Sequence, residues 1–109
     1  MFWKKQASIV ELNAVEVQAR LARGEIVLVD VREPREHGAE RIAGAISMPL
    51  SQFDPAALPG DPARIVFHCL SGHRSATAAS RCRQAGVAAE THMRGGIAAW
   101  KAAGLPTRR

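Results

Sequence analysis

Two segments of the chain, residues 26–31 and 64–68, are dominated by β-branched and other apolar residues, without the alternation of polar residues that marks a half-exposed strand. Strands that are buried on both faces have this pattern, and such strands are typical of parallel sheets. Shorter apolar stretches predict weaker strands at residues 8–10, 45–48 and 88–93. We therefore expect a sheet of four to five strands.

Between these strands, polar and apolar residues recur with a helical period. The predicted helices cover about residues 14–23, 34–40, 75–85 and 97–103. Asn13 fits the N-terminal cap of the first helix and Gly24 fits its end, and Ser51 is placed to cap one further short helix. Because strands and helices alternate, the sequence predicts an α/β fold of three layers, a central parallel sheet with helices on both faces.

The length of the chain predicts the number of domains, and its charge predicts the charge of its ligand. The chain has 109 residues, 47% of them hydrophobic, which is the size of one domain, and we expect that domain to cover residues 1–109. The formal net charge is +5, and residues 55–109 hold eight basic residues against only two acidic ones. An anionic ligand is therefore expected in the C-terminal half.

Several classes of partner are disfavoured by the same sequence. No apolar run approaches the roughly 20 residues that span a bilayer, and the N-terminal residues lack a secretory signal, so we expect a cytoplasmic protein without a membrane partner. Aromatic residues make up only 5% of the chain, so nucleic acid is not an expected partner. Two cysteines, Cys69 and Cys82, are too few for a zinc site or a disulfide framework. Residues 2–5 are interpreted as a frayed terminus rather than an interaction patch.

Cys69 carries the most informative chemistry. It follows a predicted buried strand and precedes a predicted helix, and the carboxyl ends of parallel strands are where such folds bind ligands. A thiolate at a helix N-terminus faces free backbone N–H groups and the positive end of the helix dipole. Gly72 allows the backbone to curl so that N–H groups of residues 70–74 form an anion-binding nest, and His73 and Arg74 add positive charge. This arrangement favours a nucleophilic thiolate over the alternative, a buried cysteine that only ends a core strand.

Three further side chains have open or structural interpretations. Arg74 either binds an anionic group of the substrate or braces the loop from behind, because a side chain in a first helical turn can point either way. Cys82 shares an apolar helical stripe with neighbouring alanines, so it is interpreted as a small buried hydrophobe rather than a resolving thiol. His68, at the end of its strand, is interpreted as a packed residue rather than a base.

Three ordered motifs resemble a known family. The segment Cys69-Leu-Ser-Gly-His-Arg74 resembles the active-site loop of single-domain rhodaneses. Residues 30–49, which begin Asp-Val-Arg-Glu, resemble the first motif of that family, and residues 95–106, with a double glycine, a tryptophan and Gly-Leu-Pro, resemble its closing motif. One departure is the pair Glu40-Arg41, where the family often has Gly-His. The landmarks place the core of the domain at about residues 8–107.

The resemblance implies a rhodanese-like fold and a sulfurtransferase activity. Cys69 would take the outer sulfur of a small anionic donor, thiosulfate or a persulfide, and carry it as a persulfide to cyanide, a thiol or a protein acceptor. No metal and no organic cofactor is implied. Asp30 and Arg32 would support the site. The persulfide and the donor would be held by the loop residues Leu70, Ser71, Gly72, His73 and Arg74.

Two alternatives stay open beside the enzyme. A sulfur-carrier or regulatory module would keep the fold but act through partner proteins, with little thiosulfate turnover. Cysteine-based phosphatases of similar fold have one residue more between cysteine and arginine than the four that separate Cys69 from Arg74, and the shorter loop favours a sulfur-sized occupant. The sequence does not predict an oligomeric state.

Overall fold

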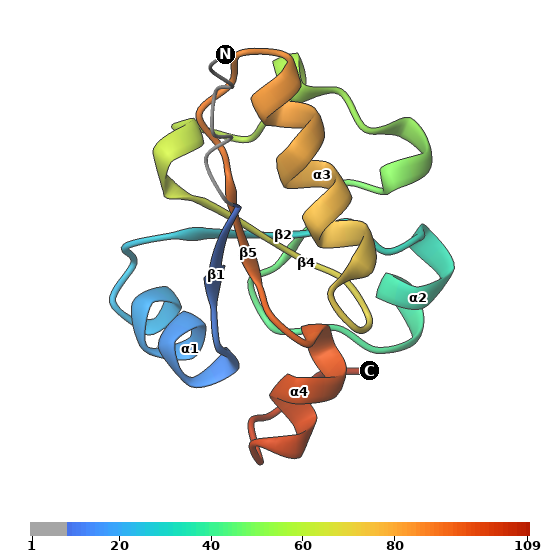
Figure 1. Ribbon diagram of the computed structural model, residues 1–109. Helices are drawn as coiled ribbons and strands as arrows, with labels where there is room; N and C mark the ends of the chain where they lie inside the picture. The colour runs from blue at the N-terminus through green and yellow to red at the C-terminus, as the bar shows by residue number, and fades with distance from the viewer. Residues whose placement is uncertain (1–8) are drawn as a thin grey trace, which may run out of the picture.

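The protein, described by a computed structural model over residues 9–109, is built around one parallel sheet (Figure 1). The strands are β1 (Val10–Leu12), β2 (Val27–Asp30), β3 (Ile46–Ser47), β4 (Ile65–His68) and β5 (Thr91–Met93). Their order in the sheet is β1-β5-β4-β2-β3, and every pair of neighbours is parallel. The predicted α/β fold with a parallel sheet is confirmed, with five strands.

Helices cover both faces of the sheet. They are α1 (Ala14–Ala22), α2 (Pro34–Ala39), α3 (His73–Gln84) and α4 (Gly96–Ala102), with short 3-10 helices at Leu50–Gln52, Pro55–Ala57 and Pro62–Arg64. Successive residues of β4 face opposite sides: Val66 packs with residues of α1 and α4, whereas Ile65 and Phe67 pack with residues of α3. This alternation explains why the strand is apolar throughout, because both of its faces are buried.

The first helix begins where the sequence predicts. The side chain of Asn13 accepts a hydrogen bond from the N–H of Glu16 at 2.8 Å, and the Glu16 carboxylate accepts one from the N–H of Asn13 at 3.0 Å. This reciprocal capping box satisfies two backbone donors that a helix start leaves free.

Other boundaries differ from the prediction. The first strand begins at Val10, and the predicted strand residue Ser8 lies outside the described residues, as do residues 2–5. Ser51 does not cap a helix; it lies inside a 3-10 helix, and its hydroxyl donates to the carboxylate of Glu33 at 2.5 Å. The third helix starts two residues earlier than expected, because Gly72 caps it with a left-handed backbone at φ 111°.

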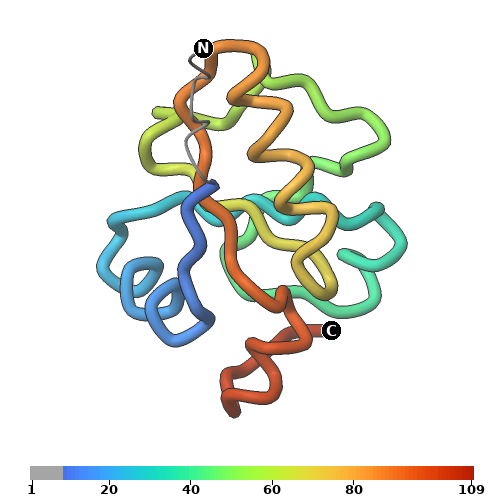
Figure 2. Tube along the Cα trace, in the orientation of Figure 1, coloured from blue at the N-terminus to red at the C-terminus, as the bar shows by residue number. Residues whose placement is uncertain are grey.

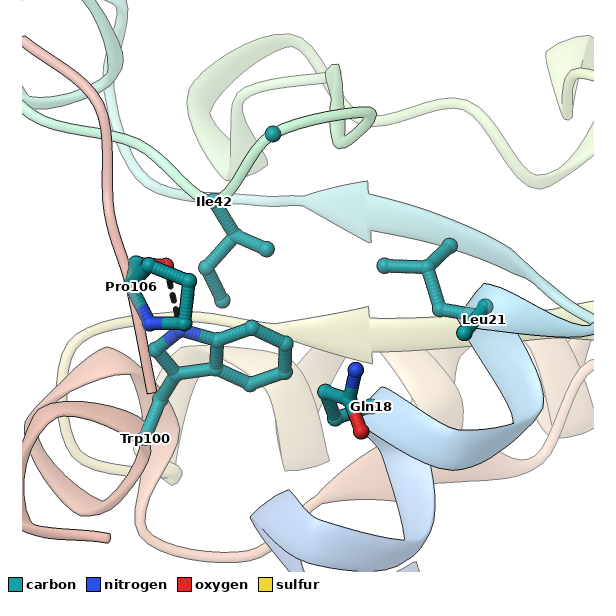
Figure 3. A pocket seen from close by; sticks show the side chains of 7 residues that line it. Gln18, Leu21, Ile42, Trp100 and Pro106 are labelled. Atoms are coloured by element: carbon teal, nitrogen blue, oxygen red, sulfur yellow. Dashed lines mark hydrogen bonds between the residues drawn. The ribbon is translucent and has the colours of Figure 1, made fainter. Parts of the chain in front are cut away.

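The first and last parts of the chain meet in the sheet. The trace in Figure 2 shows β1 beside β5, and their register pairs Glu11 with His92. On the face that α1 and α4 share, a cavity of about 180 Å³ is lined by residues that include Leu21, Ile42 and Trp100 (Figure 3). None of its lining residues belongs to the loop that holds Cys69. Within residues 9–109, the helices are too short or too polar to cross a membrane.

Candidate functional site

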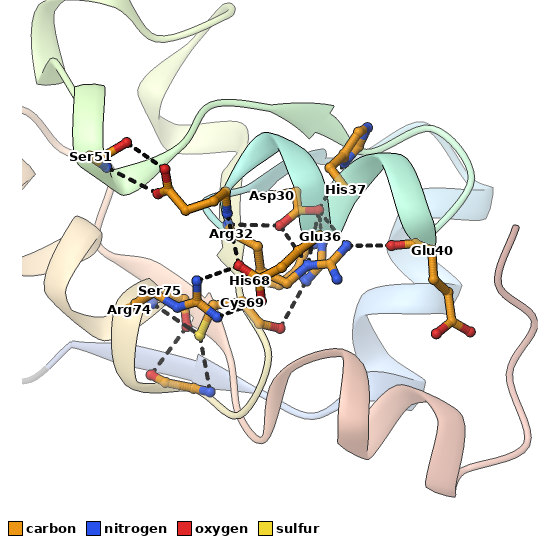
Figure 4. A network of polar contacts seen from close by, with 12 residues as sticks. Asp30, Arg32, Glu36, His37, Glu40, Ser51, His68, Cys69, Arg74 and Ser75 are labelled. Carbon is orange, nitrogen blue, oxygen red and sulfur yellow. Dashed lines mark hydrogen bonds and ion pairs between the residues drawn. The ribbon is translucent and has the colours of Figure 1, made fainter. Parts of the chain in front are cut away.

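The loop between β4 and α3 wraps around the sulfur of Cys69. Cys69 follows the last residue of β4, and its side chain is buried. The sulfur accepts hydrogen bonds from the backbone N–H groups of Gly72 at 3.1 Å and Ser75 at 3.3 Å, and it lies 3.6 Å from the hydroxyl oxygen of Ser75 (Figure 4). The curl of the loop at Gly72 therefore aims backbone donors at one atom, the sulfur.

These donors change the acidity of the thiol. Burial alone would raise the pKa of Cys69. Hydrogen bonds from the hydroxyl and N–H of Ser75, and from the N–H groups of Gly72 and Ser71, outweigh burial and hold the pKa of Cys69 below its ordinary value. A group with this environment is suited to act as a thiolate nucleophile.

The double glycine at the start of α4 lets the next element approach the loop closely. The N–H groups of Ile97 and Ala98 donate to the carbonyls of Cys69 at 2.9 Å and Leu70 at 3.1 Å. A Cβ atom on Gly96 would lie 2.4 Å from the Cys69 carbonyl oxygen, and the backbone there has φ +62°. Only glycine fits this contact without displacing the loop, because a real side chain never approaches backbone so closely.

The predicted loop residues differ in whether they contact the sulfur or lie exposed at the surface. Of the five predicted loop residues, Gly72 donates its N–H to the sulfur at 3.1 Å, and the N–H of Ser71 also contributes to the lowered pKa of Cys69. Leu70, Ser71 and His73 are exposed at the surface. Leu70 is 49% exposed. These exposed side chains border the site without shaping the sulfur's own surroundings.

Arg74 points toward α2. Its guanidinium donates two hydrogen bonds to the carboxylate of Glu36, at 2.7 and 2.9 Å (Figure 4). The hydrogen bonds from Arg74 hold the pKa of Glu36 below its ordinary value and, reciprocally, those to Glu36 raise the pKa of Arg74. In this structure the side chain ties the first turn of α3 to α2 (Figure 4).

Asp30 and Arg32 contact each other, and the hydrogen bonds of the Cys69 sulfur are made with Gly72 and Ser75 instead. The buried carboxylate of Asp30 accepts hydrogen bonds from the N–H and guanidinium of Arg32 at 2.8 to 3.2 Å, and it lies 2.8 Å from Nδ1 of His37. Burial would raise the pKa of Asp30, but these partners hold it below its ordinary value. Arg32 also donates to the carbonyl of Glu40 at 2.6 Å, so the pair connects β2 to the end of α2.

His68 lies close to both the Asp30 carboxylate and the backbone of Cys69. Its Nδ1 is 3.2 Å from the carbonyl oxygen of Cys69, and its Nε2 lies 3.8 Å from the Asp30 carboxylate without a hydrogen-bond partner. Burial lowers the pKa of His68, which favours the neutral ring. A buried neutral ring that ends a core strand agrees with its interpretation as a packed residue.

Three residues at the site were not singled out by the sequence. Ser75 contacts the sulfur, and its hydroxyl oxygen lies 2.8 Å from Nδ1 of the buried His92. Nε2 of His92 lies 3.0 Å from the carboxylate of Glu11. The sequence contains a signal only for Ser75, which stands in the first turn of the helix after Cys69. Pairing of the first strand with the last, which brings Glu11 to His92, has no local signature.

Cys82 is far less acidic than Cys69. It is fully buried on α3 among the residues that pack against the sheet, and burial raises its pKa to about 11. A protonated thiol in an apolar environment is a poor nucleophile. The structure agrees with its interpretation as a small hydrophobe.

Comparison with known proteins gives consistent matches. The family model described as "Rhodanese-like domain" matches residues 13–103. The chain is 47% identical over 83 residues to an uncharacterized protein of Synechocystis sp., a match that covers 75% of this chain and 46% of that protein. It is 35% identical over 99 residues to a protein named sulfurtransferase from Allochromatium vinosum, covering 88% of this chain and 92% of that one. The chain thus spans less than half the length of the first relative and nearly all of the second.

Solved structures give the same picture. A thiosulfate sulfurtransferase from Pseudomonas aeruginosa superposes with a TM-score of 0.81 at 31% identity, over 92% of this chain and 20% of that one. The site geometry described above therefore occurs on a fold that this larger protein also contains.

Proposed function

Because this chain belongs to the rhodanese-like domain family, we propose that it is a sulfurtransferase that carries sulfane sulfur as a persulfide on Cys69. The observation that carries the proposal is the set of polar groups around that one sulfur, which accepts from two backbone N–H groups and lies 3.6 Å from the Ser75 hydroxyl. They favour the thiolate that attacks in the first step and that leaves again in the second. The similarity to a protein named sulfurtransferase from Allochromatium vinosum supports the same class of reaction.

The reaction has two displacement steps. In the first, the Cys69 thiolate attacks the outer sulfur of thiosulfate or of a persulfide donor. The sulfur–sulfur bond of the donor breaks, and sulfite or the donor's thiolate leaves with the electron pair. In the second, cyanide, a thiolate or a protein cysteine attacks the outer sulfur of the persulfide, and the Cys69 thiolate leaves. The enzyme ends as it began.

The residues of this chain contribute mainly by stabilising negative charge on the Cys69 sulfur. The N–H groups of Gly72 and Ser75 donate to the Cys69 sulfur, so they stabilise it both as the attacking thiolate and as the leaving thiolate, without rearrangement of the backbone. Contacts from α4 to the carbonyls of Cys69 and Leu70 keep the loop in place. A rigid loop keeps the orientation of these donors fixed through both steps.

A thiosulfate:cyanide assay tests the proposal. The wild type should form thiocyanate, Cys69→Ser should form none, and Cys82→Ser, as the matched cysteine control, should keep the activity. Mass spectrometry after treatment with thiosulfate should show a gain of about 32 Da, one sulfur, on the peptide that contains Cys69. A wild type that gains no sulfur from thiosulfate or from a small persulfide would refute the proposed carrier.

A further inference from the structure

A continuous path of polar contacts leads from the thiol to the protein surface. It runs from the sulfur of Cys69 to the hydroxyl of Ser75 at 3.6 Å, to Nδ1 of His92 at 2.8 Å, and from Nε2 of His92 to the carboxylate of Glu11 at 3.0 Å. Cys69 lies in the loop between β4 and α3, Ser75 on α3, His92 on β5 and Glu11 on β1. The two displacement steps proposed above use only the first of these contacts.

The path is buried at the thiol end and exposed to solvent at the carboxylate end. Ser75 is fully buried and His92 is 3% exposed, whereas the Glu11 side chain is 45% exposed. The ionisable groups that contact His92 and Ser75 along the path are Cys69 and Glu11; β4 places the uncharged Phe67 beside His92 in the sheet. A proton that leaves the buried sulfur along these contacts thus arrives beside a carboxylate that reaches solvent.

The hydrogen-bond donors and acceptors fit two protonation states. With a neutral imidazole, Nε2–H donates to Glu11, and Nδ1 accepts from the Ser75 hydroxyl, which in turn accepts from the thiol. With an imidazolium, Nδ1–H donates to the Ser75 oxygen, and the Ser75 hydroxyl turns to the carbonyl of Gly72, which lies 3.2 Å away, or to the thiolate. Ser75 therefore has an acceptor for its proton in both states.

We propose that Ser75, His92 and Glu11 form a proton relay that deprotonates Cys69. The thiol proton passes to the Ser75 oxygen as the Ser75 hydroxyl proton passes to Nδ1 of His92, so the products are a thiolate, an unchanged serine and an imidazolium paired with the Glu11 carboxylate. Ser75 touches the reacting sulfur, and His92 and Glu11 act through it as positioning residues. The inference rests on the proposed function, because it supplies the thiolate that attacks the sulfur donor.

The relay also explains why a histidine is buried beside a nest of backbone donors. Backbone N–H groups stabilise a thiolate but accept no proton, so they leave open where the proton of a buried thiol goes. The imidazolium formed at His92 adds a positive charge one hydroxyl away from the sulfur. That charge favours the anionic thiolate and persulfide over the neutral thiol.

Glu11→Gln is the sharpest test. The amide keeps an oxygen that accepts from Nε2–H, so the variant retains the hydrogen bond and removes only the charge. Glu25→Gln is the matched control, since it removes one exposed carboxylate that is paired with Arg23 instead. The thiolate is read directly from its absorbance at about 240 nm during a pH titration. The chain has no tyrosine to interfere, and Cys82, with a pKa near 11, titrates at higher pH.

We expect Glu11→Gln to lower the ratio of thiolate to thiol at the wild-type midpoint about threefold, the effect of losing an ion pair with one exposed partner. Glu25→Gln should leave the ratio unchanged. Glu11→Gln should no longer lower the ratio of thiolate to thiol when Ser75→Ala or His92→Asn is already present, because either change interrupts the path of contacts. Equal titrations for Glu11→Gln and Glu25→Gln would overturn the relay, as would a Glu11→Gln effect that persists in both backgrounds.

The titration separates this inference from the proposed function. It requires no sulfur donor, so a protein that shows the coupled titration but forms no persulfide would refute the proposed function and leave the relay standing. A protein that forms a persulfide while Glu11→Gln titrates like the wild type would refute the relay alone.

Discussion

The contact between Arg74 and Glu36 allows a quantitative test of what the arginine of the loop does. Two hydrogen bonds of 2.7 and 2.9 Å join the guanidinium to the carboxylate, and the two side chains are 31% and 33% exposed. Fully exposed ion pairs contribute about 0.2–1 kcal/mol, whereas breaking a buried pair costs about 3–5 kcal/mol. Because one third of each side chain is solvated and the geometry is bidentate, we expect a coupling free energy of about 1 kcal/mol.

A double-mutant cycle measures this coupling. Arg74→Ala, Glu36→Ala and the double variant are unfolded with urea beside the wild type. The cycle is needed because Glu36 also accepts the N–H of Glu33 at 3.0 Å, so Glu36→Ala alone weakens the cap of α2 as well. About 1 kcal/mol corresponds to a shift of about 4–8 °C in Tm for a domain of this size. The exposed pair of Arg23 and Glu25 serves as the control and should show the smaller coupling.

Kinetics then decide between bracing and substrate binding. If Arg74 braces the loop, Arg74→Ala and Glu36→Gln should change kcat for thiosulfate in the same direction and leave KM nearly unaltered. A coupling free energy near zero, together with a KM that rises in Arg74→Ala but not in Glu36→Gln, would refute the bracing role. That result would assign the guanidinium to the anionic group of the donor.

Two further predictions concern stability. Gly96→Ala should lower the free energy of unfolding in urea by at least about 3 kcal/mol, because its Cβ would overlap the Cys69 carbonyl and its φ is positive. Gly86→Ala is the control, since φ is positive there but the space is open, and it should lower the free energy of unfolding by only about 1 kcal/mol. Equal losses in the two variants would contradict the clash. The carboxylates of Asp30 and Glu36 have pKa values below those of the unfolded chain, so their stabilisation is present at neutral pH and is lost as the pH falls below about 5 and through their folded values. Thermal unfolding across this range should show a flatter pH dependence in Asp30→Asn, and an unchanged slope would contradict the assignment.

Local patterns account for most of what the sequence predicted correctly. The buried strands at residues 26–31 and 64–68 are apolar on both faces, and the structure places one helical layer against each face. The cap at Asn13 depends on Glu16, three residues away, so it is visible in the sequence. The position of Cys69 follows from the same logic, because a strand end, a glycine and a helix start are neighbours along the chain.

Long-range pairings account for what the sequence did not predict. Glu36 meets Arg74 and Glu11 meets His92 only because separate elements are packed together, at separations of 38 and 81 residues. Strand order decides the second pair, since β1 lies beside β5 rather than beside β2. No periodicity within one segment encodes which strand becomes its neighbour. The side chains that tune the thiol are therefore less predictable than the thiol itself.

The groups that hydrogen-bond the Cys69 sulfur are backbone N–H groups and a hydroxyl, not the positive side chains of the C-terminal half. The positive charge of Arg74 still acts on Cys69 through space, since the two groups interact electrostatically. Arg74 is paired with Glu36, and Lys101 lies 2.9 Å from the carboxylate of Glu40. The Ser75 hydroxyl and the N–H groups of the loop, whose positions the backbone geometry fixes, therefore both lower the pKa of Cys69. Substitution of the exposed Leu70, Ser71 and His73 side chains leaves that geometry in place, so we expect these three positions to change recognition of donor and acceptor without changing the thiol.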